Sequence, residues 1–261
     1  WEARRYVMKL GIVGKGGVGK TTISALIAEA YASRGKRVVA IDTDSNPNLG
    51  VSLGLAFADA EAMPVVPRSV ASGPGAGLDG AELLATYGTQ TPAGVTVLSA
   101  MRVDQAAAGC TCGSHAAVRS MLRDVLDDEA DVTIVDMEAG LEHLSRSGGT
   151  LAYADVLLMV MEPSRKSVMT AARTVALADE LGIPRCLGVG NKARPDDAAF
   201  FAEACAASGV EVAAVIPLDA AIPAADRAGS GVVDAAADDA RAAISELVDR
   251  LEALSLVADH E

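Results

Sequence analysis

Short apolar runs recur along the chain, and polar or helix-like stretches separate most of them. The runs are rich in Val and Ile and lack the strict alternation of a half-exposed strand, so they suit strands buried on both faces. They cover residues 7–13, 37–42, 95–101, 132–136, 155–161, 185–190 and 210–216. Between most of these runs the spacing of apolar residues predicts helices at residues 20–34, 115–129, 164–182, 196–208 and 234–255.

This alternation of strands and helices predicts a single α/β domain with a mainly parallel, twisted sheet of about seven strands flanked by helices. Residues 8–261 are assigned to the domain, because no internal repeat or linker divides them. Residues 1–7 are interpreted as a leader or cloning remnant, since "MKLGIV" already has the pattern of a first strand. Residues 56–94 have a weaker pattern, and "SVASGPGAGLDG" within them predicts a mobile excursion.

Composition and charge exclude several classes of function. The formal net charge of −13 argues against a nucleic-acid surface and against binding to an anionic membrane. No apolar run reaches the roughly 18 residues that span a bilayer, and the start lacks a signal-peptide cleavage pattern, so we expect a cytoplasmic protein. In a reducing cytosol, four cysteines are more often free thiols, metal ligands or redox groups than disulfide partners.

The strongest chemical motif lies between the first predicted strand and the first predicted helix, in "GIVGKGGVGKTTISALIAEAYA". Its spacing is that of a phosphate-binding loop (P-loop), in which glycines let several backbone N–H groups point at the phosphates. We expect Lys20 to reach the β and γ phosphates of a nucleotide, Thr21 to hold Mg²⁺ and Thr22 to contact the α phosphate. The loop residues expected to surround the phosphates are Gly14, Lys15, Gly16, Gly17, Val18 and Gly19.

A second lysine, Lys15, follows the first glycine of the loop, and "KGGVGKTT" resembles the deviant Walker A motif of the SIMIBI ATPases. That group contains MinD, ParA, the nitrogenase iron protein and the CooC-type ATPases. The resemblance implies that the protein hydrolyses ATP and that two copies sandwich the nucleotides between them. It also implies that Lys15 contacts the phosphates bound by the partner subunit, where a cation supplied in trans stabilises the transition state.

Carboxylates follow two of the predicted strands. "VVAIDTDSNPNLG" places Asp42 and Asp44 at the end of the second strand, and "VTIVDMEAG" places Asp136 at the end of another, four residues before Gly140. By resemblance to the family, Asp42 belongs to the magnesium shell and Asp44 positions the attacking water. Asp136 matches a Walker B aspartate that would also serve Mg²⁺, and Gly140 matches the switch II glycine that senses the γ phosphate.

Two further segments resemble the family's motifs for binding the base of the nucleotide. "GVGNKAR" would place Asn191 on the adenine and Lys192 under it. "VIPLD" would place Pro217 near the base. Together with Lys15, Lys20 and Asp44 as the catalytic residues, these assignments complete a predicted ATP site.

Half of the cysteines stand in one tripeptide, Cys110-Thr-Cys112, between Gly109 and Gly113. A disulfide within it would close a very small, strained ring, and two small buried residues would not explain a shared loop between glycines. We therefore favour a metal site. Two thiolates are too few for a closed sulfur site, which takes four, and a symmetric dimer would supply the other two.

The cysteine pair points to one branch of the ATPases. CooC-type maturation ATPases of carbon monoxide dehydrogenase carry a C-x-C pair at this place, and "MKLGIVGKGGVGKTT", "VDMEAGLEHLSRS", "MVMEPSRKSV" and "GVGNKAR" are similar to theirs. The resemblance implies that four sulfurs of a homodimer bind one Ni²⁺ or Zn²⁺ ion and that nickel is delivered to carbon monoxide dehydrogenase. His115 is outside the family motif and is interpreted as a helix-start residue, and His143 as a packing or switch residue.

Other functions fit the sequence less well. A reductase like the nitrogenase iron protein needs cysteines after the Walker B strand, and "DMEAGLEH" has none. A MinD-like regulator would end in a basic amphipathic helix, whereas the last predicted helix is acidic, and a ParA-like protein would need a basic surface. A carrier ATPase for another metalloenzyme, such as acetyl-CoA synthase, or for iron–sulfur assembly stays open as the alternative. The sequence also leaves the metal open, because Cys₄ suits zinc at least as well as nickel.

Overall fold

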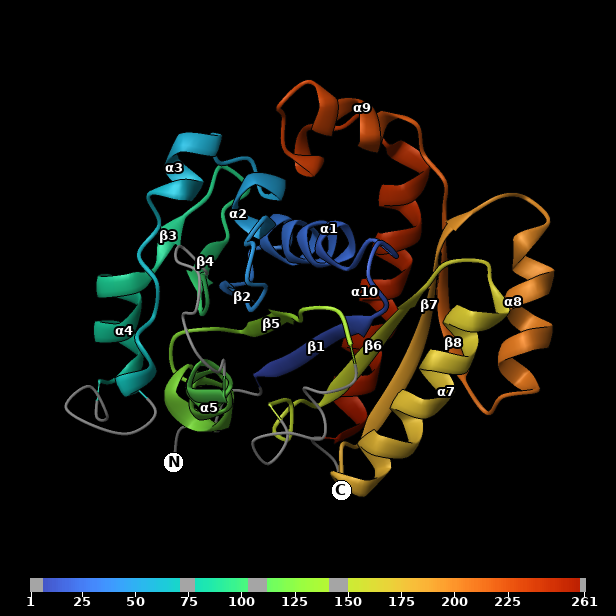
Figure 1. Ribbon diagram of the computed structural model, residues 1–261, viewed down its shortest axis with the longest axis horizontal. Coiled ribbons are helices and arrows are strands. Elements are labelled where there is room, and N and C mark those ends of the chain that lie inside the picture. The colour runs from blue at the N-terminus through green and yellow to red at the C-terminus, as the bar shows by residue number, and fades with distance from the viewer. Residues whose placement is uncertain (1–6, 71–77, 103–111, 141–149, 259–261) are drawn as a thin grey trace.

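A sheet of eight strands forms the centre of the computed structural model, which describes residues 7–70, 78–102, 112–140 and 150–258 (Figure 1). The strand order is β3-β4-β2-β5-β1-β6-β7-β8, and every neighbouring pair is parallel except β3 and β4. The strands are β1 (Met8–Gly14), β2 (Val38–Asp42), β3 (Thr89–Gln90), β4 (Thr96–Ser99), β5 (Val132–Asp136), β6 (Val156–Met161), β7 (Arg185–Ala193) and β8 (Glu211–Pro217).

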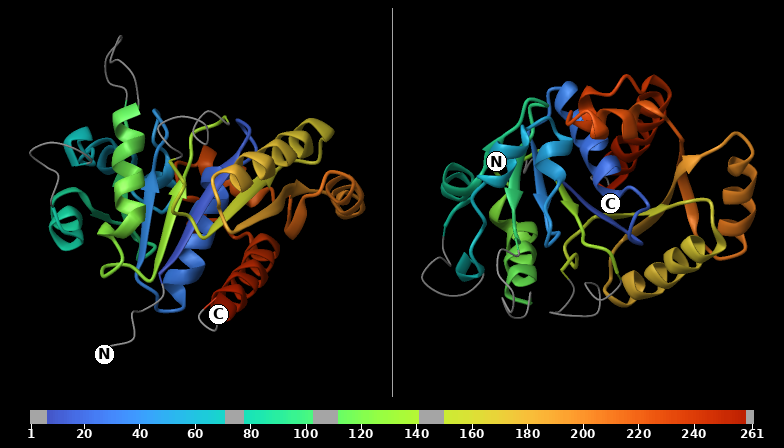
Figure 2. Two further views of the ribbon diagram at one scale, coloured as in Figure 1. Left: turned by 90° about the horizontal axis from the view of Figure 1, so that it is seen from below. Right: turned by 45° about the horizontal axis from the view of Figure 1, so that its top comes forward.

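Helices cover both faces of this sheet (Figure 2). Successive strand residues point to opposite faces, so Ile12 packs in the core beneath α1 and α10, while Val13 packs in the core with α5, α7 and α8. Within the described residues, none of the helices is long and apolar enough to cross a membrane. The longer helices are α1 (Lys20–Ser33), α4 (Gly80–Tyr87), α5 (Cys112–Ser120), α7 (Arg165–Glu180), α8 (Asp197–Ala206) and α10 (Asp238–Ala258).

Shorter helical segments connect these elements. A π-helical turn, η2 (Met121–Val125), continues α5 toward β5. The others are α2 (Leu49–Ser52), α3 (Phe57–Glu61), α9 (Ala221–Arg227) and the 3₁₀ turns η1 (Arg68–Val70) and η3 (Val232–Asp234).

The prediction of an α/β domain with a mainly parallel sheet is confirmed. All seven predicted strands are present, and the eighth, β3, is a two-residue antiparallel edge. The five predicted helices correspond to α1, α5 with η2, α7, α8 and α10.

The predicted helix at residues 115–129 begins three residues earlier than expected, because α5 starts at Cys112. The described part of residues 56–94 is more regular than its weak pattern indicated, since it forms α3, η1, α4 and β3. The predicted excursion at residues 69–80 falls mainly on residues 71–77, which lie outside the described residues. In α4 the helix start is fixed by Asp79, whose side chain accepts a hydrogen bond from the Glu82 N–H at 2.8 Å.

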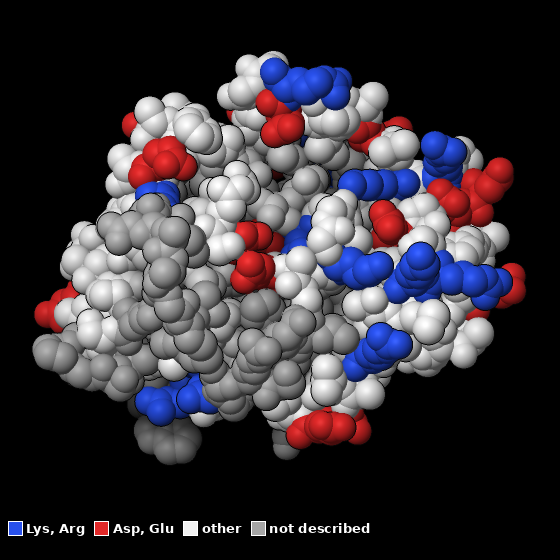
Figure 3. Space-filling model, in the orientation of Figure 1, with Lys and Arg blue, Asp and Glu red and all other residues white. Residues whose placement is uncertain are grey.

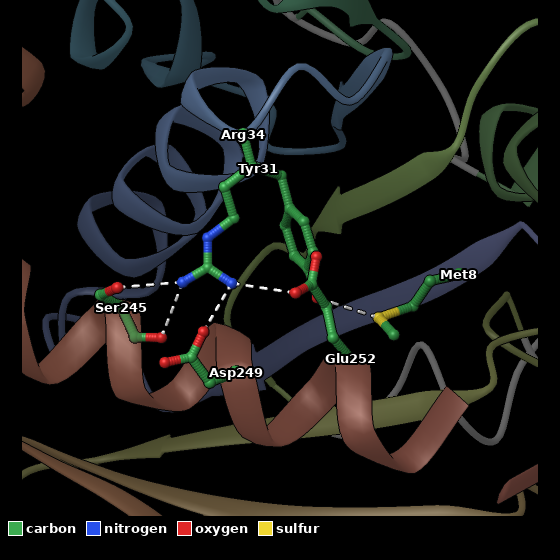
Figure 4. Close-up of polar contacts among 6 residues, drawn as sticks. All are labelled: Met8, Tyr31, Arg34, Ser245, Asp249 and Glu252. Carbon is green, nitrogen blue, oxygen red and sulfur yellow. Dashed lines mark hydrogen bonds and ion pairs between the residues drawn. The ribbon is translucent and has the colours of Figure 1, made fainter. Parts of the chain in front are cut away.

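The C-terminal helix is tied to the first helix by one arginine (Figure 4). Arg34 forms ion pairs with Asp249 at 2.7 Å and Glu252 at 3.0 Å, and it donates a hydrogen bond to the Ser245 carbonyl at 3.1 Å. Beneath it, the Tyr31 hydroxyl lies 3.2 Å from the Met8 sulfur. The acidic helix α10 therefore packs on α1, with Arg34 compensating two of its carboxylates.

The strand order brings the chemical groups to one edge. β1 lies between β5 and β6, and β5 lies between β1 and β2, so the carboxyl ends of β1, β2 and β5 are neighbours. Asp136 is in register with Ile12 of β1 and with Asp42 of β2. Open α/β sheets bind ligands at the carboxyl ends of their parallel strands, at the point where the connections from two adjacent strands run to opposite sides of the sheet.

Candidate nucleotide-binding site

The loop between β1 and α1 has the conformation that phosphate binding requires. Gly14 has φ +149°, and a Cβ there would lie 2.5 Å from the Val160 carbonyl oxygen of β6. Gly19 has φ +95° just before α1, a left-handed conformation that side chains other than glycine rarely adopt. The loop thus ends at the positive N-terminus of a fourteen-residue helix, where backbone N–H groups are free to bind an anion.

Lys20 is buried at the first turn of α1, with 8% of its surface exposed. Its Nζ donates a hydrogen bond to the Lys15 carbonyl at 3.2 Å. Burial lowers the pKa of Lys20, and the negative charges of Asp136, Asp44 and Glu138 work in the opposite direction. A buried ammonium group facing three carboxylates is suited to exchange its carbonyl contact for a phosphate.

Asp136 ends β5 directly beside α1. Its Oδ1 accepts a hydrogen bond from the Ser24 hydroxyl at 3.1 Å, and the Thr21 hydroxyl also hydrogen-bonds to this carboxylate. Burial raises the pKa of Asp136 to about 7, and the neighbouring Asp42 charge adds to the effect. The carboxylate is thus destabilised as an anion until a cation approaches it.

Asp42 is buried at the end of β2 and both of its oxygens accept backbone hydrogen bonds. Oδ1 accepts from the Asp44 N–H at 3.0 Å, and Oδ2 accepts from Asn48 at 3.0 Å and Leu49 at 2.9 Å. Burial raises the pKa of Asp42 to about 6 despite these donors. Asp42 therefore fixes the path of the segment after β2. This segment places Asp44 close enough to Lys20 for the negative charge of Asp44 to affect the pKa of Lys20.

The residues present fit Mg²⁺ with ATP. Magnesium prefers oxygen ligands and is usually held by one or two carboxylates, a hydroxyl and phosphate oxygens. The Thr21 hydroxyl and the Asp136 carboxylate already contact each other, and the raised pKa of both Asp42 and Asp136 indicates a buried pair that a divalent cation would neutralise.

The predicted base-binding residues lie against the P-loop. The Asn191 amide donates a hydrogen bond to the Val18 carbonyl at 2.8 Å, and the Lys192 ammonium donates to the Gly17 carbonyl at 2.6 Å. Lys192 is the one described non-glycine residue with positive φ, at +56°. Pro217 ends β8 beside Ala193, next to this segment. Contact with adenine stays a prediction, whereas support of the loop by both side chains is a property that the sequence analysis missed.

Glu138 is a further site residue that the sequence analysis missed. Its Oε1 accepts a hydrogen bond from the Ser45 hydroxyl at 3.1 Å, and its N–H donates to the Thr43 hydroxyl at 3.3 Å. The Thr43 hydroxyl in turn donates to the Asp136 carbonyl at 2.8 Å. These bonds join the segments that follow β2 and β5. The signal in the sequence was a second acidic residue two positions after Asp136.

The cysteine pair falls at the margin of the described residues. Cys110 and His143 lie outside them, and Cys112 begins α5 but its side chain is not among those described. His115 is buried on α5. Among the described residues, no group of three or more His, Cys, Asp and Glu is placed to hold a metal ion. The predicted metal site of Cys110 and Cys112 is therefore untested by the structure.

The other two cysteines have the properties of unreactive thiols. Cys186 of β7 is half-buried, and Cys205 of α8 is buried. Burial raises the pKa of Cys186 to about 11 and also raises the pKa of Cys205. Both thiols therefore stay protonated at neutral pH, which disfavours metal binding by either.

The fold and the site define a P-loop nucleotide-binding protein. Residues 12–232 match the model of the CobQ/CobB/MinD/ParA nucleotide binding domain. The chain is 36% identical to the carbon monoxide dehydrogenase accessory protein CooC of Rhodospirillum rubrum over 94% of this chain and 97% of that protein. It is 31% identical to an uncharacterized ATP-binding protein of Methanocaldococcus jannaschii, over 81% of this chain and 86% of the other. The MinD cell division protein of Aquifex aeolicus has the same fold, with a TM-score of 0.71 at 20% identity over 95% and 97% of the chains.

The chain belongs to the CobQ/CobB/MinD/ParA nucleotide-binding family and, within it, to the CooC-type ATPases. It is an ATP-hydrolysing enzyme of the P-loop class. The roles of Lys15, Lys20 and the carboxylates described above in phosphoryl transfer stay predictions.

Proposed function

We propose that the protein is a Mg²⁺-ATP-dependent, dimerising metallochaperone that carries nickel to carbon monoxide dehydrogenase. The observation that carries the proposal is the 36% identity to a carbon monoxide dehydrogenase accessory protein over nearly the full length of both chains. The C-x-C tripeptide at Cys110 and Cys112 adds a chemical reason, because a carrier needs a metal-binding group that an ATPase alone does not. The proposed location is the cytoplasm, where thiols stay reduced.

In the proposed ATP cycle, each subunit binds one nucleotide on its own P-loop. Lys20 holds the β and γ phosphates, while Lys15 reaches the phosphates of the other subunit and stabilises the charge of the transition state. Asp44 orients the attacking water. Mg²⁺, held by Thr21, Asp136 and Asp42, would neutralise phosphate charge during transfer.

The nucleotide base is proposed to bind beside the loop, against Asn191, Lys192 and Pro217. The Asn191 amide uses one hydrogen in its bond to the Val18 carbonyl, so its other hydrogen and its carbonyl oxygen remain for the adenine edge. The same side chain would then connect base recognition to the shape of the phosphate-binding loop.

Nickel is the proposed cargo, bound between two subunits. Each chain contributes Cys110 and Cys112, so a dimer offers four thiolates to one ion. ATP and metal would both favour the closed dimer, and hydrolysis would open it and release the ion to the client enzyme. Zinc is the competing ion, because four thiolates suit it equally well.

Metal titration of the reduced, nucleotide-free protein tests this proposal. We expect binding to saturate at about one Ni²⁺ per two chains and to convert monomers to dimers, as measured by analytical ultracentrifugation with metal analysis. Cys110→Ser and Cys112→Ser should abolish the metal-driven dimer but not ATP binding, and Cys205→Ser is the matched control that should behave like the parent. One ion per chain, retained in the double Cys110/Cys112 variant, would refute the proposed metal site.

A further inference from the structure

Three side chains of α1 act on the carboxylate of Asp136. The charge of Lys20 partly offsets the raised pKa of Asp136, and the hydroxyls of Thr21 and Ser24 both hydrogen-bond to the carboxylate. Ser24 lies one helical turn beyond Lys20 and Thr21, on the same side of the helix. Lys20 and Thr21 already have proposed partners in the nucleotide complex, namely the phosphates and Mg²⁺. Ser24 has no such partner, so its role has to be sought in its bond to Asp136.

The bond between Ser24 and Asp136 lies below the surface of the site. The Ser24 hydroxyl donates to Oδ1 of Asp136 at 3.1 Å, and the two residues have 0% and 2% of their surface exposed. Figure 3 shows acidic side chains and a basic one near the centre of this face, where β2, β5 and α1 come together in Figure 1. Because Ser24 is fully buried, it is placed to act on Asp136 rather than on a nucleotide.

A hydroxyl at this position is unusual, because the neighbours of Ser24 on α1 belong to the hydrophobic core. Ile23, Ala25 and Leu26 are all buried there. A serine inside a helix usually points to solvent or bonds back to the carbonyl four residues before it, and a buried hydroxyl without a partner costs free energy. The Ser24 hydroxyl bonds across to the end of β5, 112 residues along the chain. Such a bond is stronger when its acceptor is a charged carboxylate.

From these observations we propose that Ser24 is a positioning residue for Asp136, and this inference rests on the magnesium role proposed for Asp136 above. In the proposed complex the Thr21 oxygen is a ligand of Mg²⁺, so Ser24 is the hydroxyl of α1 that continues to hold the carboxylate. With Oδ1 bonded to Ser24, the carboxylate keeps one orientation and loses less freedom when it binds a cation. Removal of the hydrogen-bond partner of a metal ligand typically weakens metal binding by roughly 10- to 100-fold.

Binding of ADP to the full-length protein at increasing free Mg²⁺ tests this inference. Isothermal titration calorimetry gives the dissociation constant of ADP in EDTA and the Mg²⁺ concentration that produces half of the gain in affinity. We expect Ser24→Ala to need about tenfold more free Mg²⁺ than the parent for half of this gain. Ser24→Thr retains the hydroxyl and should have the Mg²⁺ requirement of the parent. If Ser24→Ala does not fold, Ser24→Cys takes its place, because a thiol is only a weak donor.

Thr174→Val is the matched control, because it removes the hydroxyl of another buried residue, one that donates to the Thr170 carbonyl at 3.0 Å within α7. It should have the Mg²⁺ requirement of the parent. A Ser24→Ala protein that differs from the parent only in its stability in urea would overturn the inference, because the hydroxyl would then merely satisfy a buried carboxylate.

Asp136→Asn distinguishes the inference from the proposal on which it rests. If Asp136→Asn raises the Mg²⁺ requirement and Ser24→Ala does not, the role of Ser24 is wrong and the magnesium role of Asp136 stands. If Asp136→Asn leaves the Mg²⁺ requirement unchanged, the magnesium role itself fails, and the role of Ser24 fails with it.

Discussion

Replacement of Asn191 by Ala tests how the segment after β7 supports the phosphate-binding loop. Asn191 has 5% of its surface exposed, and its amide is the donor to the Val18 carbonyl at 2.8 Å. Leaving a buried carbonyl without its donor costs about 1–3 kcal/mol. We therefore expect Asn191→Ala to lower the free energy of unfolding by about this amount. If the loop leaves its binding conformation in this variant, nucleotide binding has to supply the same free energy to bring the loop back. This energy corresponds to roughly 5- to 140-fold weaker nucleotide binding.

Urea unfolding and isothermal titration calorimetry with Mg²⁺-ATP and Mg²⁺-GTP measure the two effects. Loop support predicts that Asn191→Ala weakens binding of both nucleotides, and adenine recognition adds a further loss for ATP alone. Asn191→Asp should be at least as damaging, because it places a carboxylate oxygen against the Val18 carbonyl. Gln90→Ala, which removes an exposed amide donor from the edge strand β3, is the matched control and should have little effect on either quantity.

The result that would refute this reasoning is an Asn191→Ala protein whose unfolding free energy and affinity for both nucleotides equal those of the parent. A selective loss of ATP binding, with GTP binding and stability unchanged, would also contradict loop support and leave only contact with the base.

Three further predictions concern the same site. Lys20→Ala should abolish ATP binding or hydrolysis, whereas Lys15→Ala should retain nucleotide but lose turnover and the ATP-stabilised dimer. Fluorescent-nucleotide binding and analytical ultracentrifugation measure these effects. A Lys15→Ala protein that dimerises and hydrolyses ATP like the parent would contradict the role of Lys15 in trans. Folding raises the pKa of Asp42 to about 6 and of Asp136 to about 7, so the free energy of unfolding of the nucleotide-free protein, measured in urea, should fall as the pH rises from about 4 to about 7. Asp136→Asn should flatten this pH dependence. A parent protein whose stability rises over this range would contradict the prediction. Glu138→Gln keeps an acceptor for the Ser45 hydroxyl but removes a negative charge near Lys20. Calorimetry should therefore find tighter ATP binding, and unchanged or weaker binding would contradict this prediction.

Much of the fold could be predicted because its strands are buried on both faces. Every residue of β5 and β6 is buried, and most are apolar, so the pattern of these strands is not interrupted by exposed polar positions. The loop of residues 14–21 was equally predictable, since its glycines are needed locally and do not depend on distant contacts. The carboxylates at the ends of β2 and β5 followed from the rule that parallel strands end at one edge.

The missed features depend on contacts that sequence patterns do not contain. β3 is a two-residue polar edge, and α9 buries none of its side chains, so neither has a hydrophobic period to detect. The bonds from Asn191 and Lys192 to the P-loop join residues more than 170 positions apart. Asp42 was assigned to the magnesium shell by resemblance to the family, and only the folded chain shows that it also accepts hydrogen bonds from the backbone of Asn48 and Leu49.

Nickel transfer is the measurement that tests the central claim most directly. Nickel-free carbon monoxide dehydrogenase is mixed with the nickel-loaded protein and a competing chelator, and carbon monoxide oxidation is followed with and without Mg²⁺-ATP. The account predicts activation by the parent with ATP, little activation without ATP, and none with Lys20→Ala or Cys112→Ser. Activation that is equal for the parent and for these two variants would contradict it, because the enzyme would then acquire nickel without the ATP site or the cysteine pair.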